Sequence, residues 1–146
     1  MPIDTLVKLL QFSISPIVLI SAASLLLLSI TNRLGRTIDR SRTLVRELEG
    51  HNDLPFKEDH KDQLQILLRR SRYLRSAVLC ISACIFLAAM MTMSLFLLAF
   101  AGWPLTYAVL ACLFLGVLAI CSAVVFLILD VSAGLKALEV EVSRHI

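Results

Sequence analysis

The sequence predicts an all-α membrane protein with three transmembrane helices, a cytoplasmic helical hairpin and a helical C-terminal tail, as a single membrane domain over residues 1–146. Hydrophobic residues make up 58% of the chain and charged residues 17%, whereas soluble domains have about 45–50% apolar residues. The excess positive charge is confined to one segment between the first two of three long stretches that contain no charged residue. These uncharged stretches are 9–30, 77–100 and 105–129.

Each uncharged stretch is long enough to cross a membrane. A helix needs about 20 apolar residues to span the hydrocarbon layer, and helices are favoured there because lipid offers the backbone no hydrogen-bond partners. Small residues at helical spacing allow the second and third spans to pack closely. They are Ala77, Cys80, Cys84 and Ala88 in the second span, and Ala108, Cys112, Gly116, Ala119 and Ala123 in the third.

The segment 31–76 indicates the orientation of the chain in the membrane. It contains eleven Lys or Arg and seven Asp or Glu residues, a net charge of +4, against −1 for the remainder. Lys and Arg beside membrane helices favour the cytoplasmic side. We therefore expect this segment and the C-terminus in the cytoplasm, and the N-terminus and the short turn 101–104 outside. Trp103 in that turn suits the membrane interface.

Two helical arms are expected to form a hairpin within this segment. In the first arm, apolar or small residues alternate at intervals of four and three, a stripe of coiled-coil type. This stripe consists of Leu34, Ile38, Ser41, Val45 and Leu48. The stretch 50–55 predicts a helix end and a turn. A second arm begins near Phe56 and runs into the second span, with its apolar side marked by Leu64, Leu67, Leu68 and Leu74.

The tail 130–146 is predicted to be a third helical arm. Its apolar residues continue the alternating spacing at Val131, Leu135, Leu138 and Val142. A narrow stripe needs a packing partner, and the hairpin is the nearest candidate. The alternative is that the tail lies along the membrane surface. Asp130 and Lys8 lie near the ends of spans, so their side chains are expected to reach toward water.

A basic motif follows the first span directly. Its members, which are candidates for contacting lipid, a second subunit or another partner, are Arg33, Arg36, Asp39, Arg40 and Arg42. A basic residue close to anionic headgroups contributes about 1 kcal/mol. Asp39 is expected to pair with an arginine of the second arm, from Arg69, Arg70, Arg72 and Arg75. The alternative is that Asp39 is a functional switch, and a salt bridge is favoured for a carboxylate among arginines. Nucleic acid is not an expected partner, because seven acids share the segment and no aromatic residue lies between the arginines.

The first span is more polar than the other two. Gln11, Ser13 and Ser15 precede Pro16, which is expected to kink the helix. One interpretation is a polar path that forms when several subunits place this helix together. The other is that the serines bond to neighbouring backbone between helices.

No enzyme activity, cofactor or metal is expected. The four cysteines, Cys80, Cys84, Cys112 and Cys121, lie in apolar stretches without zinc-type spacing, which is typical of packing residues. The three histidines, His51, His60 and His145, lie in polar stretches. The sequence contains no phosphate loop or nucleophile motif.

The stretch TNRLGRTIDRSR, residues 31–42, resembles a motif that follows the first span in a family of small bacterial membrane proteins known only as a domain of unknown function. The matching residues are Thr31, Asn32, Arg33, Leu34, Arg36, Asp39, Arg40 and Arg42. A weaker match is LLRRSRYLRSAVL, residues 67–79. The resemblance implies a bacterial inner-membrane protein with three spans, and it supplies no activity.

Two classes of function fit these features. The first is a homo-oligomeric structural or interaction protein whose cytoplasmic helices bind each other or a cytoplasmic protein. The second is an oligomeric ion channel lined by the first span, which requires a ring of subunits because one chain has too few helices for a pore.

Overall fold

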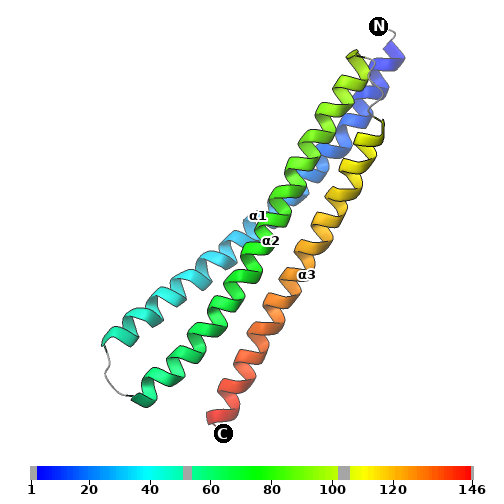
Figure 1. The fold of residues 1–146 in the computed structure, drawn as a ribbon. Coiled ribbons are helices and arrows are strands. Elements are labelled where there is room, and N and C mark those ends of the chain that lie inside the picture. Colours follow the sequence, from blue (N-terminus) through cyan, green and yellow to red (C-terminus); the bar gives the residue numbers. More distant parts are fainter. Residues whose placement is uncertain (1–2, 51–53, 102–105, 146) are drawn as a thin grey trace. The chain divides into compact units, whose positions relative to one another are not determined.

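The protein is entirely helical over the residues that its computed structural model describes, which are 3–50, 54–101 and 106–145 (Figure 1). The helices are α1 (Ile3–Gly50), α2 (Leu54–Ala101) and α3 (Thr106–His145). Side chains are described for residues 7, 11, 14–48, 63–98 and 106–135. The all-helical prediction is confirmed for this part of the chain.

Each of the first two helices combines an uncharged stretch with a charged one, without a break. The predicted helix end is confirmed, since α1 stops at Gly50 and α2 starts at Leu54. The expected continuation of the second arm into the second span is confirmed by the unbroken course of α2. Residues 51–53 and 102–104 of the two predicted turns lie outside the described residues.

The chain divides into two compact units, each containing parts of all three helices. The first, here called the apolar unit, comprises residues 1–28 and 79–123. The second, the charged unit, comprises residues 29–78 and 124–146 and contains the basic motif. Each unit is described separately below.

Small side chains make up much of the core of the apolar unit, beside the fully buried Ile81. Ala23, Cys84, Ala88 and Ala123 are at most 2% exposed. Gly116 is also buried, and a Cβ atom placed on it would lie 4.0 Å from the Cys84 sulfur, an ordinary contact distance. Small residues therefore allow α2 and α3 to approach closely, as the sequence predicted.

The core of the charged unit differs from the predicted stripe of the first arm. Thr37 and Leu44 are buried, whereas Ile38 and Val45 are 38% and 39% exposed. Intervals of three and four beginning at Leu34 reach either set of positions, so the repeat alone does not choose between neighbours. The prediction that Ile38 and Val45 belong to the inward-facing stripe of the first arm is therefore wrong, because Thr37 and Leu44 are buried in their place.

Buried positions recur every seven residues along each helix. They are Pro16, Ala23, Ile30, Thr37 and Leu44 in α1; Ala77, Cys84 and Met91 in α2; and Gly116, Ala123 and Asp130 in α3. A seven-residue repeat keeps one narrow face of a helix toward its partners. The last position of the α3 series is an acid.

Candidate functional site

Asp130 is the buried charged residue around which the candidate site of the charged unit is built. Its side chain is 0% exposed, although aspartate is almost never fully buried unless it is paired. The expectation that Asp130 reaches toward water at the end of its span is therefore wrong. Its place in the seven-residue series turns the carboxylate toward the helix partners instead.

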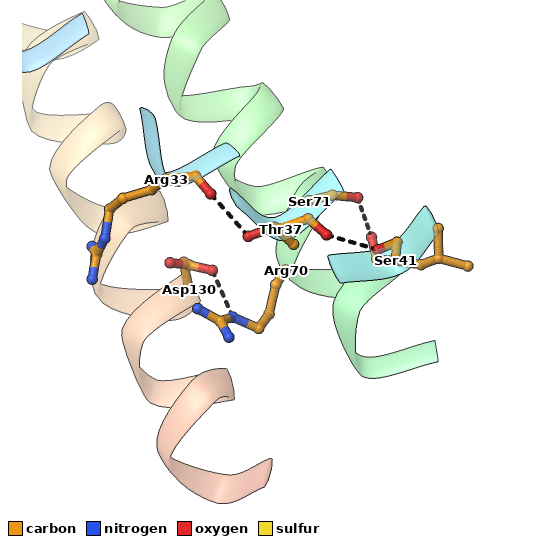
Figure 2. Close-up of polar contacts among 7 residues, drawn as sticks. Arg33, Thr37, Ser41, Arg70, Ser71 and Asp130 are labelled. Atoms are coloured by element: carbon orange, nitrogen blue, oxygen red, sulfur yellow. Dashed lines mark hydrogen bonds and ion pairs between the residues drawn. The ribbon is translucent and has the colours of Figure 1, made fainter. Parts of the chain in front are cut away.

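Arg70 of α2 pairs with this carboxylate. Its Nε atom donates a hydrogen bond of 3.0 Å to Asp130 Oδ1 across 60 residues of sequence (Figure 2). The Arg70 side chain is 28% exposed, while that of Asp130 is fully buried. A charge-assisted hydrogen bond of this kind offsets part of the cost of removing both charges from water. The pair links α2 to α3 within the charged unit.

Gly134 makes room for the arginine. It lies four residues after Asp130, on the same face of α3. A Cβ atom at this position would lie 3.2 Å from Arg70 Cζ and 3.4 Å from both terminal nitrogens. Glycine inside a helix costs about 1 kcal/mol relative to alanine, and here it permits the guanidinium to lie directly against the α3 backbone.

One oxygen of the buried carboxylate is unsatisfied. Asp130 Oδ2 is buried and has no hydrogen-bond partner in the described part of the chain. Buried acceptors are normally paired, because an unmade hydrogen bond costs about 1–3 kcal/mol. Arg70 is therefore the group that compensates the Asp130 charge, and Asp130 depends on it strongly.

Polar groups of α1 in the same unit are satisfied within their own helix. The Thr37 hydroxyl donates to the Arg33 carbonyl at 3.0 Å, and the Ser41 hydroxyl donates to the Thr37 carbonyl at 2.8 Å (Figure 2). Thr37 is only 6% exposed. Its methyl group and internally bonded hydroxyl allow a polar residue to occupy a core position without an orphaned donor.

The basic motif lies on the surface of the charged unit. Arg36, Asp39, Arg40 and Arg42 are exposed, and Arg33 is partly buried. Asp39 forms no ion pair with any residue for which side chains are described, so the predicted pairing with an arginine of the second arm is not found. Arg70, one of its four expected partners, is bound to Asp130 instead.

The other arginines of the second arm have different surroundings. Arg69 Nε donates to the Tyr73 hydroxyl at 3.1 Å, and its Cζ lies 6.0 Å from the centre of the Tyr73 ring. This distance is at the outer limit of a cation–π contact. Arg72 and Arg75 are exposed.

The candidate polar path is only partly described. Gln11 and Ser15 are exposed on α1, and the Ser13 side chain lies outside the described residues. Two further serines of the span bond within their own helix: Ser21 donates to the Ile17 carbonyl at 3.0 Å and Ser24 to the Ile20 carbonyl at 2.8 Å. The hydroxyls of Ser21 and Ser24 thus need neither another helix nor a water-filled path.

Sequence reasoning missed the main feature of the charged unit. The sequence pattern places Asp130 at the end of a span and offers Arg70 as one of four possible partners of Asp39, so it does not join the two residues. A usable signal exists: Asp130 continues the series Gly116 and Ala123 at seven-residue intervals. An acid at a core position predicts a basic partner on a facing helix.

Three helices of the described chain are long and apolar enough to cross a membrane, within Ile14–Leu48, Gln63–Leu98 and Thr106–Leu135. This defines a multi-pass membrane protein. The family described as "Protein of unknown function (DUF2721)" matches residues 13–140. The chain belongs to this family, which agrees with the resemblance to an uncharacterised family. Comparison with curated proteins and with solved structures gives no match.

Proposed function

We propose that this chain is a homo-oligomeric interaction protein of the bacterial inner membrane that acts through the outer surface of its charged unit. The positive charge of segment 31–76 supports a cytoplasmic position for that unit, with the N-terminus outside. In this arrangement the charged parts of α1 and α2 stand in the cytoplasm as a hairpin, and α3 supplies the third arm.

The observation behind this proposal is the exposed outer face of α1 in the charged unit. Its inner face is occupied by Ile30, Thr37 and Leu44, all of them buried. The outer surface exposes apolar side chains, Ile38 and Val45, among the charged members of the basic motif. Apolar anchors within a charged rim are typical of protein interfaces.

A second copy of the chain is the partner we propose for this surface. Asp39 is exposed without an ion-pair partner among the described residues, and Arg36, Arg40 and Arg42 surround it in sequence and are exposed. The same surface thus presents both charges, so two copies related by a two-fold axis can pair Asp39 of each with an arginine of the other. Such pairing gives specificity more than affinity.

Cross-linking of the purified protein in lipid bilayers tests this proposal. A photo-reactive amino acid at Ile38 or Val45 is expected to give covalent dimers, because both positions face outward. The same group at Thr37 or Leu44 is the matched control, since these neighbours face the inside of the chain. Dimers of equal yield at all four positions, or none at Ile38 and Val45, contradict the proposal.

The alternative is an oligomeric channel, and one observation favours it. Gln11 and Ser15 are both exposed and lie four residues apart, so they share one face of α1. A polar face toward lipid is unfavourable, and a ring of subunits would cover it. Ion flux in reconstituted vesicles that Gln11→Leu and Ser15→Leu abolish, while Ile14→Leu preserves it, would establish the channel. Absence of flux across pH and voltage leaves the interaction proposal.

A further inference from the structure

Two neighbouring arginines of α2, Arg69 and Arg70, each donate a hydrogen bond through the Nε atom alone. Arg69 uses Nε to bind the Tyr73 hydroxyl, and Arg70 uses Nε to bind Asp130 Oδ1. A guanidinium has five N–H donors, four of them on its terminal nitrogens. No acceptor within the described residues engages those terminal nitrogens. The two side chains therefore present eight N–H donors that the described residues of the charged unit do not use.

Both guanidinium groups are also ordered in advance. Tyr73 positions Arg69 through the hydrogen bond and the ring contact. Asp130 and the bare backbone at Gly134 position Arg70, which keeps a 28% exposed side chain. Arginine side chains otherwise lose considerable rotamer freedom on binding a ligand, so prior ordering lowers the cost of binding.

The chemistry of this pair fits a phosphate group. Terminal guanidinium nitrogens bind two phosphate oxygens side by side, which is the geometry that favours arginine over lysine. The surrounding charge is positive: Arg69, Arg70, Arg72 and Arg75 lie within seven residues, and Asp130 neutralises only one of them.

We propose that Arg69 and Arg70 form a binding site for a phosphate-bearing anion, with Tyr73, Asp130 and Gly134 as positioning residues. The stretch 77–100 begins directly after these arginines, so in a membrane-spanning α2 they lie near the depth of lipid headgroups. An anionic phospholipid and free phosphate are the two sources of this chemistry. The inference does not depend on self-association of the chain.

Native mass spectrometry of the full chain in detergent tests the site with phosphatidylglycerol and phosphatidylcholine, each alone and in competition with inorganic phosphate. We expect tighter binding of phosphatidylglycerol. Arg69→Lys and Arg70→Lys keep the charge but lose the paired donors, so each should weaken that binding roughly tenfold. Displacement by inorganic phosphate identifies a free-phosphate site, and its failure to displace identifies a lipid site.

Arg72→Lys and Arg75→Lys are the matched controls, because these arginines of the same helix are exposed and no side chain among the described residues positions their guanidinium groups. They should change affinity less than about twofold. Gly134→Ala should weaken binding by displacing the Arg70 guanidinium. Arg69→Lys leaves the Asp130 pair intact, so it reports on binding even where the Arg70 and Gly134 variants unfold. Equal weakening by all four lysine variants, or equal binding of both lipids without binding of inorganic phosphate, overturns the proposal.

Discussion

At the residue scale, two glycines that occupy helix interiors have opposite surroundings. A Cβ atom at Gly35 meets no atom within 4 Å, whereas one at Gly134 meets the Arg70 guanidinium at 3.2 Å. Gly35→Ala should therefore stabilise the protein by about 0.5–1 kcal/mol through helix propensity. Gly134→Ala should destabilise it by about 1 kcal/mol, because Arg70 is tied to Asp130 and the added methyl group crowds it. Equilibrium unfolding by SDS in bicelles measures both; the same sign for the two variants contradicts this interpretation.

The ion pair makes a second prediction at this scale. Arg70→Ala leaves the fully buried Asp130 charge without compensation, which should cost about 3 kcal/mol, the lower end of the range for buried pairs because Arg70 is partly exposed. The double variant Arg70→Met with Asp130→Leu removes both charges and should recover most of that loss. Unfolding free energies of Arg70→Met, Asp130→Leu and the double variant, each compared with the unsubstituted protein, form a double-mutant cycle. Additive losses would show that the pair contributes no coupling.

At the scale of the helix, adjacent residues of α1 should respond very differently to truncation. Leu44 is 1% exposed and Val45 is 39% exposed. Leu44→Ala should cost about 2–5 kcal/mol because it leaves a cavity. Val45→Ala should change the stability of a single, undimerised chain by about 0.5 kcal/mol or less, as at other surface positions. The same unfolding assay compares the two variants. A larger loss of stability for Val45→Ala than for Leu44→Ala would support the predicted stripe that contains Val45.

The elements were largely predictable from sequence, and the site was not. The length of the uncharged stretches predicts the helices, and Gly50 and Pro55 predict the break between α1 and α2. Both signals are local in the sequence, so they can be read without knowledge of the packing. Which of two adjacent α1 residues faces the core depends on the partner helices, so the spacing alone does not predict that Thr37 is buried rather than Ile38. The Arg70–Asp130 contact joins residues 60 positions apart, and local periodicity places an acid on a face without naming its partner.

At the scale of the whole molecule, the expected orientation is open to direct measurement. In a variant whose four cysteines are replaced by alanine or serine, Pro2→Cys should react with an impermeant maleimide added outside intact cells. Asn52→Cys should react only after the membrane is permeabilised. The reason is the concentration of Lys and Arg in segment 31–76. Labelling of Asn52→Cys in intact cells would contradict the expected topology and would show that segment 31–76 lies outside the cell.

The burial of Asp130 also has a consequence for the order of synthesis. Its partner Arg70 is made 60 residues earlier, so α1 and α2 are complete before the acid that compensates this arginine has been translated. A chain released before residue 130 has an Arg70 that lacks this partner. A chain that reaches this point must bring Asp130 against α2, because the carboxylate has no other described counter-ion. The Arg70–Asp130 pair of the charged unit thus forms only when the last helix is in place, and chains truncated before residue 130 lack it.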